Sequence, residues 1–176
     1  MNSHSMSAQS LNTAPFTPII IIESTAWDYK TIRGWQALIN NLLREALPFL
    51  PLGDHPHVRL NAELNIVLMD DKGISHLNET WRHKKGPTNV LSFPVSPELT
   101  QPHAPKTLGD IVLAYETIQR EAIDQGKPFE NHLQHLIIHG FLHLLGYDHE
   151  NQEEANAMEA LEVKMLNALN IPNPYE

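Results

Sequence analysis

The 176-residue sequence contains no cysteine, so it has neither disulfide bonds nor thiolate metal ligands. Histidine and carboxylate side chains remain as donors for any metal site. The absence of cysteine is typical of cytoplasmic proteins, and we expect this location. Residues 1–14 have neither the basic start nor the apolar run of a signal peptide, so we expect a flexible N-terminal tail and no membrane partner.

Positive charge is also scarce. Lysine and arginine together number 12, against 21 aspartate and glutamate residues, which gives a formal net charge of −9 at pH 7. This balance argues against broad electrostatic attraction to nucleic acid. The basic residues are unevenly distributed, however, because Lys72, Arg82, Lys84 and Lys85 fall close together. We expect this run to form either a local cationic patch on an acidic protein or a solvated basic loop.

Apolar periodicity predicts a single folded domain over residues 15–170, followed by a C-terminal tail at 171–176. Strands are expected at 19–22, 58–69, 90–93 and 111–115, and helices at 32–46, 70–81, 116–125, 129–145 and 152–169. This order predicts an α+β fold in which about five helices cover a small mixed β-sheet of about four strands.

Two details of this plan concern the segment between the second and fourth strands. Asp70 is expected to cap the helix that follows it, and Ile74, Leu77 and Trp81 are expected to lie on the inner side of that helix. The proline-rich segment 96–107 is expected to be an irregular excursion that could border a cleft.

The segment 139–149 carries three histidines whose spacing is typical of a metal site. His139 and His143 are four residues apart, so on a helix they share one face, with Cβ atoms ~6 Å apart. Gly146 allows the helix to end in a left-handed turn, after which His149 can supply a third nitrogen. Three neutral imidazoles leave one tetrahedral position open, as in catalytic zinc sites. We therefore expect one Zn²⁺, with nickel or another divalent ion as the alternative.

The spacing of the three histidines and Gly146 also matches the metzincin protease pattern H-E-x-x-H-x-x-G-x-x-H. Gly140 stands where those proteases carry the glutamate that acts as general base. A peptidase of that type would lack its proton acceptor. Zinc on three histidines lowers the pKa of its bound water to ~7, so hydroxide is available without this glutamate.

Three motifs point to one known family. They are His139-Gly140-x-Leu142-His143-Leu144-x-Gly146-Tyr147-Asp148-His149, Pro87-Thr88-Asn89-Val90-Leu91-Ser92-Phe93-Pro94 and Leu108-Gly109-Asp110-Ile111. Together they resemble the YbeY family of bacterial metal-dependent endoribonucleases, and the likeness extends from about Ile19 to Leu169. Asn89 takes the place of an aspartate that many members carry.

The resemblance implies a single α+β domain with a zincin-like metal helix and a zinc-type ion on the three histidines. It implies a hydrolytic endoribonuclease that acts in maturation of the 3′ end of small-subunit (16S) ribosomal RNA and in ribosome quality control. The partners would be single-stranded RNA, ribosomal RNA, the small ribosomal subunit and ribosome-associated factors. Single strands are the easier substrates, because unstacked bases leave the backbone accessible.

Arg82 and the metal ligand His139 are the candidate catalytic residues. The resemblance places a functional arginine at this Trp-Arg position, and a guanidinium matches two phosphate oxygens. Lys84 and Lys85 lie beside Arg82 in the sequence and are candidate substrate contacts. The alternative for Arg82 is a surface ion pair.

Four other residues have alternative roles. Asp148 could orient an imidazole by accepting its second N–H, or it could cap the following helix. His135 lies one helical turn before His139, so we expect it to support the metal ligands or contact substrate rather than act as a fourth ligand. His132 is expected to be solvated or packed. Asp110 either accepts backbone N–H groups at a strand start or belongs to the site.

Two other functions compete with the nuclease. A metallopeptidase-like hydrolase is favoured by the histidine spacing and opposed by Gly140. A ribosome-associated binding factor would use the metal only to join the motif helix to its final turn. The attacking group of the nuclease, either water activated by the metal or the 2′-hydroxyl of the RNA, is left open by the sequence.

Overall fold

The computed structural model describes residues 16–27, 34–50, 62–95 and 107–176. The strands are β1 (Phe16–Ile22), β2 (Ala62–Met69), β3 (Val90–Pro94) and β4 (Thr107–Ala114). The helices are α2 (Trp35–Ala46), α3 (Asp71–Arg82), α4 (Tyr115–Asp124), α5 (Phe129–Leu144) and α6 (Gln152–Ala168), with a short 3-10 helix, η1, at Leu47–Phe49. The expected order of strands and helices is confirmed, and the fold is α+β.

The strands form one mixed sheet in the order β1-β2-β4-β3. β1, β2 and β4 are parallel to one another, and β3 is antiparallel to β4. β4 therefore lies inside the sheet, and its residues from Ile111 to Ala114 are all buried. A strand covered on both faces is expected to be apolar on both faces, as this stretch is.

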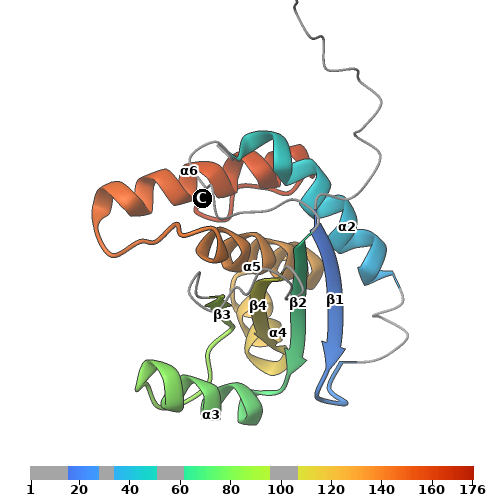
Figure 1. Ribbon diagram of the computed structural model, residues 1–176, viewed down its shortest axis with the longest axis vertical. Coiled ribbons are helices and arrows are strands. Elements are labelled where there is room, and N and C mark those ends of the chain that lie inside the picture. Colours follow the sequence, from blue (N-terminus) through green and yellow to red (C-terminus); the bar gives the residue numbers. More distant parts are fainter. Residues whose placement is uncertain (1–15, 28–33, 51–61, 96–106) are drawn as a thin grey trace, which may run out of the picture.

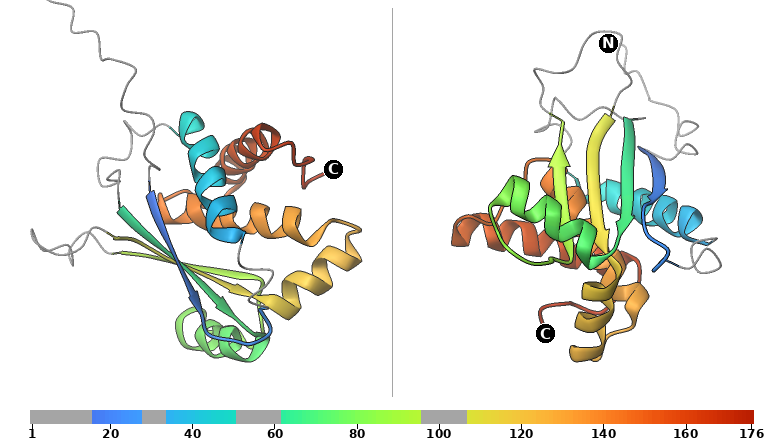
Figure 2. Two further views of the ribbon diagram at one scale, coloured as in Figure 1. Left: turned by 90° about the vertical axis from the view of Figure 1, so that its right-hand side faces the viewer. Right: turned by 90° about the horizontal axis from the view of Figure 1, so that it is seen from below.

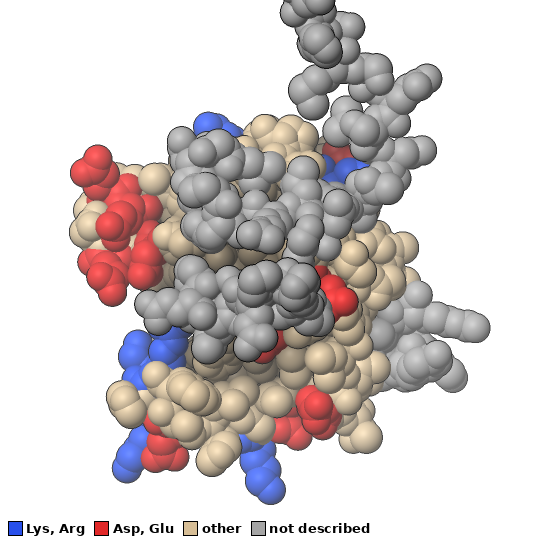
Figure 3. Space-filling model, in the orientation of Figure 1, with Lys and Arg blue, Asp and Glu red and all other residues tan. Residues whose placement is uncertain are grey.

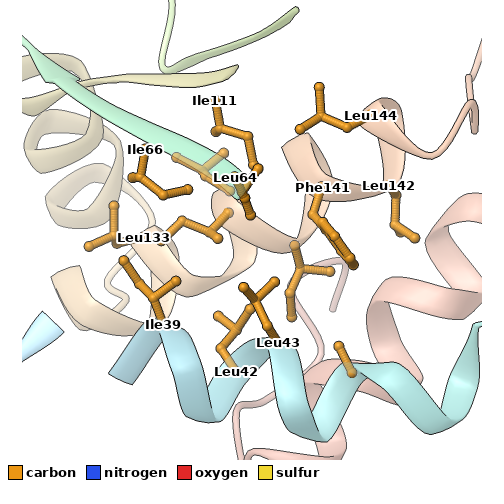
Figure 4. Close-up of a cluster of buried hydrophobic side chains, with 14 of the residues drawn as sticks. Ile39, Leu42, Leu43, Leu64, Ile66, Ile111, Leu133, Phe141, Leu142 and Leu144 are labelled. Carbon is orange, nitrogen blue, oxygen red and sulfur yellow. The ribbon is translucent and has the colours of Figure 1, made fainter. Parts of the chain in front are cut away.

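Helices cover both faces of the sheet (Figures 1 and 2). α2, α5 and α6 lie on one side, and α3 lies on the other. The larger core fills the space between the sheet and the first group of helices (Figure 4); its labelled members include Ile39, Leu42 and Leu43 of α2, Leu64 and Ile66 of β2, and Leu133 and Phe141 of α5. A smaller cluster of Ile74, Leu91, Val112 and Ala114 lies under α3. Burial of these side chains supplies most of the driving force for folding.

The strand predicted at residues 111–115 was too short, because β4 begins at Thr107 and Tyr115 opens α4. Gly109 explains the error, since it interrupts the apolar run that signals a strand. Its φ is +135°, and a Cβ at this position would lie 2.3 Å from the carbonyl oxygen of Phe93 on β3. Only glycine fits this close pairing of β3 with β4.

The capping prediction for α3 is confirmed, because Oδ1 of Asp70 accepts a hydrogen bond from the backbone N–H of Gly73 at 2.7 Å. Ile74 is buried and Leu77 packs against the smaller core cluster, as expected. The inward orientation predicted for Trp81 is wrong, because this side chain is 65% exposed. The inner face of α3 is thus apolar only over its first turns.

Residues 171–176, which we expected to form a tail, pack onto the domain. Ile171 is buried, and the backbone carbonyl of Pro174 accepts a hydrogen bond from Nζ of Lys127 at 2.7 Å. The expected N-terminal tail, the start of the first helix at 32–33, the strand residues 58–61 and the excursion at 96–106 lie outside the described residues. Among the described helices, none is long and apolar enough to span a membrane.

Candidate metal centre and active-site cleft

The three histidines of the motif meet at one point, as their spacing predicts. His139 and His143 lie one turn apart on α5, and their Nε2 atoms are 3.2 Å apart. Gly146 follows the helix with a φ of +94°, and its N–H donates to the carbonyl of His143 at 3.0 Å. The chain then turns back, so that one ring nitrogen from each of His139, His143 and His149 lies within 4.8 Å of the others.

Hydrogen bonds on the outer nitrogens orient two of these rings. Nδ1 of His139 lies 2.7 Å from a carboxylate oxygen of Glu162, and Nδ1 of His143 lies 2.9 Å from the carbonyl of Tyr147. A carboxylate oxygen and a carbonyl oxygen can only accept, so each Nδ1 donates. In the neutral imidazole this leaves the lone pair on Nε2. This arrangement is common where histidines bind a metal through Nε2.

Glu162, on α6, is fully buried and holds the network together. Its carboxylate also accepts hydrogen bonds from Nε2 of His135 at 3.1 Å and from the hydroxyl of Tyr175. Burial alone would raise the pKa of Glu162, but the hydrogen bonds from His135, His139 and Tyr175 outweigh it and lower the pKa to about 2. The same burial and the same hydrogen bond raise the pKa of Tyr175. Glu162 is therefore a permanent carboxylate acceptor behind the histidines.

Glu162 and Tyr175 were not predicted from the sequence. One signal for Glu162 was present, because it interrupts the apolar stripe that Met158, Met165 and Leu166 form on α6. A charged residue within such a stripe needs a partner in the interior. Tyr175 fell in a segment that we expected to be a tail.

A cleft of about 610 Å³ opens beside the histidines. The three histidines and Asp148 line one side, and Asn78, Arg82, Lys84, Lys85 and the β3 segment around Ser92 line the other. Figure 3 shows basic side chains near the end of α3 and acidic side chains near the start of α6, on the same side of the molecule. Arg82, Lys84 and Lys85 of the expected cationic patch therefore border the histidine cluster, whereas Lys72, at the start of α3, does not line the cleft.

The turn that carries the basic residues is held by Asn78 on α3. Its side-chain amide donates to the backbone carbonyl of Gly86 at 3.0 Å, and its backbone carbonyl accepts from the N–H of Lys84 at 3.3 Å. His83 ends α3 in the left-handed conformation, with a φ of 55°. Arg82 has no ion pair with any described residue, so its guanidinium is available to an anion in the cleft.

Asp148 has neither of the two roles expected for it. Asn151, not Asp148, caps α6 by accepting the N–H of Glu154 at 3.0 Å. Oδ1 of Asp148 lies 4.0 Å from Nδ1 of His143, which is too far for a hydrogen bond, and accepts the backbone N–H of His149 at 2.8 Å. It therefore orders the backbone of the third histidine rather than an imidazole ring.

Of the remaining candidates, His135 lies beside His139, with ring centroids 6.3 Å apart, whereas His132 and Asp110 do not line the cleft. His135 supports Glu162 and lines a separate cavity of about 290 Å³. His132 is packed, with Nε2 at 2.8 Å from a carboxylate oxygen of Glu121. Asp110 accepts from the side-chain amide of Asn65 at 2.7 Å, so its partner is a side chain on the neighbouring strand rather than backbone N–H groups.

Gly140 is needed for packing between α5 and the sheet. A Cβ at this position would lie 2.9 Å from Oγ of Ser92 and 3.0 Å from Cγ2 of Ile111. Oγ of Ser92 also donates to the carbonyl of Gly140 at 3.1 Å. The position that holds a catalytic glutamate in metzincins is thus turned toward the core of this protein and cannot hold a longer side chain without repacking.

Comparison with known proteins identifies the family. A family model described as Endoribonuclease YbeY matches residues 22–170. The chain belongs to the YbeY family. A YbeY relative from Nitrobacter hamburgensis, named Endoribonuclease YbeY, is 58% identical over 166 residues, which cover 92% of this chain and 82% of the relative. Another with the same name, from Rhodopseudomonas palustris strain BisA53, is 57% identical over 117 residues, covering 65% of this chain and 68% of the relative.

A solved structure is also similar. A protein from Thermotoga maritima, determined in solution, aligns with a TM-score of 0.49 and 22% sequence identity. The alignment covers 86% of this chain and 92% of that chain.

Proposed function

We propose that this protein is a zinc-dependent endoribonuclease of the cytoplasm that cleaves single-stranded RNA. Its substrate is the 3′ end of small-subunit ribosomal RNA, during maturation and in ribosome quality control, and its partners are the small ribosomal subunit and associated factors. One observation carries the proposal: a single cleft is lined both by three converging histidines and by Arg82, Lys84 and Lys85. Cations beside a metal-ligand set fit an anionic phosphodiester better than a neutral peptide bond. The names of the relatives support the same activity.

The donor set fits a transition-metal ion. His139, His143 and His149 would hold it through nitrogen, with no cysteine in the chain to compete. We assign zinc, because three imidazoles with one open position are typical of catalytic zinc, with nickel or another divalent ion as the alternative occupant. When bound, such an ion supplies Lewis-acid chemistry, offsetting negative charge on a phosphate oxygen and making a nearby water more acidic.

The side chains of the cleft then have separate tasks. Arg82 binds the scissile phosphate with two N–H groups and offsets the charge that grows when a fifth oxygen approaches phosphorus. Lys84 and Lys85 bind neighbouring phosphates and so fix the position of the strand. Glu162 holds His139 in the orientation in which its Nε2 faces the cleft. The histidine helix supplies no carboxylate at Gly140, so the peptidase alternative lacks its general base.

The test is cleavage of an end-labelled single-stranded RNA by the zinc-loaded protein, with an unfolded protein as a parallel substrate. We expect RNA cleavage, and at least ~100-fold lower kcat/KM in His143→Ala and Arg82→Ala. Arg44→Ala is the matched control, since it removes an exposed arginine of α2. Cleavage of the protein substrate that disappears in His143→Ala would contradict the nuclease and support the peptidase.

Two further outcomes are decisive. If the protein binds RNA but cleavage stays at background, the binding-factor alternative is supported. If Arg82→Ala cleaves at the wild-type rate, the assignment of Arg82 is wrong. Product ends identify the attacking group: a 2′,3′-cyclic phosphate shows attack by the 2′-hydroxyl, whereas its absence from the earliest products shows attack by water.

A further inference from the structure

Trp81 is the exception among the tryptophans. Trp27 and Trp35 are 3% and 4% exposed and pack against each other in the core, whereas Trp81 is 65% exposed. Trp81 lies in the last turn of α3, immediately before Arg82. An exposed indole next to Arg82, which lines the cationic cleft, offers a flat apolar face to a ligand bound there.

The indole is held in place rather than loose. Its ring meets Phe93 of β3 in an edge-to-face contact, with centroids 6.3 Å apart and an interplanar angle of 71°. Ser92 and Pro94, on either side of Phe93, line the cleft, whereas Phe93 points to the opposite face of the sheet. The indole therefore lies outside the cleft, beside the edge strand β3 and next to Arg82. α3 itself is anchored by the buried Ile74. A ring that is already ordered and still mostly exposed loses little conformational entropy when a flat ligand stacks on it.

Charge indicates the path of an anionic strand through the cleft. The side formed by α3 carries Arg82, Lys84 and Lys85, whereas the start of α6 carries the exposed Glu150, Glu153 and Glu154. Figure 3 shows the two groups separated on the same side of the molecule. A polyanion that leaves the histidines is attracted toward α3 and repelled from α6. The strand therefore passes the end of α3, where Trp81 lies.

We propose that Trp81 is a stacking platform for an unpaired base of the RNA, next to the scissile phosphate on the α3 side of the cleft. The inference rests on the proposed function and names the part of the site that selects single-stranded substrate. Aromatic side chains interleaved with cations are the usual means of binding single strands, because every base offers a flat face whatever the sequence. Bases in a duplex are already stacked and cannot use the platform.

The first test compares the kinetics of RNA cleavage by the zinc-loaded wild type, Trp81→Ala and Trp81→Phe. Loss of one stacked base is expected to raise KM ~5- to 100-fold in Trp81→Ala while kcat changes little, and phenylalanine is expected to restore most of the loss. Ile123→Ala is the matched control, since Ile123 is 73% exposed on α4. A Trp81→Ala enzyme with wild-type KM, or one with an equal loss from phenylalanine and alanine, overturns the proposal.

The second test uses tryptophan fluorescence in the His143→Ala background, which is expected to bind RNA without cutting it. Because Trp27 and Trp35 are buried, quenching on addition of single-stranded RNA reports on Trp81. We expect quenching by the single strand, little by the duplex, and none in the double variant with Trp81→Phe. Equal quenching in that double variant overturns the platform.

The two proposals fail in different ways. Cleavage that is indifferent to Trp81 refutes the platform and leaves the nuclease intact. If quenching depends on Trp81 but the wild type does not cleave RNA, the nuclease proposal is refuted and the stacking platform is supported. If the wild type shows no cleavage and no quenching is seen, both proposals are refuted.

Discussion

Nδ1 of His139 donates a hydrogen bond of 2.7 Å to the carboxylate of Glu162, a residue on another helix that is fully buried. The bond fixes which ring nitrogen faces the cleft. It also ties the histidine cluster to α6, because the same carboxylate accepts from His135 and Tyr175. Metal binding by the three histidines is therefore expected to depend on a residue that is not itself a ligand.

Glu162→Gln is expected to weaken zinc binding by ~10- to 100-fold, the usual effect of losing an outer partner of a metal-bound histidine. Glutamine has the same shape but only one acceptor oxygen for three donors. Competition with a fluorescent zinc chelator measures the change. Glu159→Gln is the control, because Glu159 is an exposed residue of α6 within one turn. Unchanged zinc affinity in Glu162→Gln would show that the hydrogen bond serves folding alone.

Removal of zinc is expected to abolish activity and preserve the fold. The histidines lie at the cleft, whereas the core between the sheet and α2, α5 and α6 is formed by apolar side chains. Far-ultraviolet circular dichroism should be unchanged by a chelator, and zinc at 100 times its Kd should add only ~2.7 kcal/mol to the free energy of unfolding. Collapse of the spectrum on chelation would support a structural metal.

Gly140→Ala is expected to destabilise the protein by ~1–3 kcal/mol, even though alanine favours helices. The new methyl group would lie 2.9 Å from Oγ of Ser92. Ser92 is buried and bonded to the carbonyl of residue 140, so it cannot turn away without leaving its hydroxyl unpaired. Urea unfolding measures the loss. Gly34→Ala, where no atom lies within 4 Å of the added Cβ, should change stability less.

Gly140→Glu extends this prediction to function. We expect it to unfold the protein or to displace α5 from the sheet, and to produce no peptidase activity, since a side chain at residue 140 would collide with Ser92 and Ile111. A folded, proteolytically active Gly140→Glu would contradict this expectation.

Asn89→Asp is expected to destabilise the protein at neutral pH and progressively less as the pH falls. The amide of Asn89 donates to Glu121 at 3.0 Å. Burial would raise the pKa of Glu121, but the hydrogen bonds from His132 and Asn89 outweigh it and lower the pKa. In the wild type this stabilisation is present above the ordinary pKa of 4.5 and is lost as the pH falls below it.

An aspartate at position 89 reverses the direction of the pKa shift and therefore of the pH dependence of stability. Two adjacent carboxylates raise one folded-state pKa above its unfolded value, so the folded protein takes up a proton and the repulsion fades on acidification. Urea unfolding of the metal-free proteins at pH 7.5 and pH 5 measures the difference. Asn156→Asp is the control, because its Oδ1 only accepts a hydrogen bond, from Gln152. A penalty for Asn89→Asp that does not change with pH would refute the repulsion.

The metal histidines could be predicted from the sequence because their geometry is local. His139 and His143 share a helix, and the turn at Gly146 fixes the approach of His149. The cap at Asp70 is local in the same sense. Glu162 could not be assigned to His139, because its partner is 23 residues away on another helix, and periodicity does not say which helices touch.

The wrong expectation for Trp81 comes from the end of its helix. Trp81 continues the apolar spacing of α3, but there the helix has reached β3, the edge strand, and less of the sheet remains to cover the indole. The capping role considered for Asp148 is wrong for another reason: α6 begins at Gln152, as expected, so the residue directly before it is Asn151. The end of an element is set by what it packs against.

The position of β4 governs when the active site can be completed during translation. β4 pairs with both β2 and β3 but follows them in the chain, so the basic segment around Arg82 leaves the ribosome before the sheet can be joined. The histidines follow later still, and Glu162 follows them on α6. Domains made from their N-terminus fold as their long-range partners emerge. A nascent chain therefore carries the basic residues of the cleft well before it carries the three histidines and the carboxylate that orients His139.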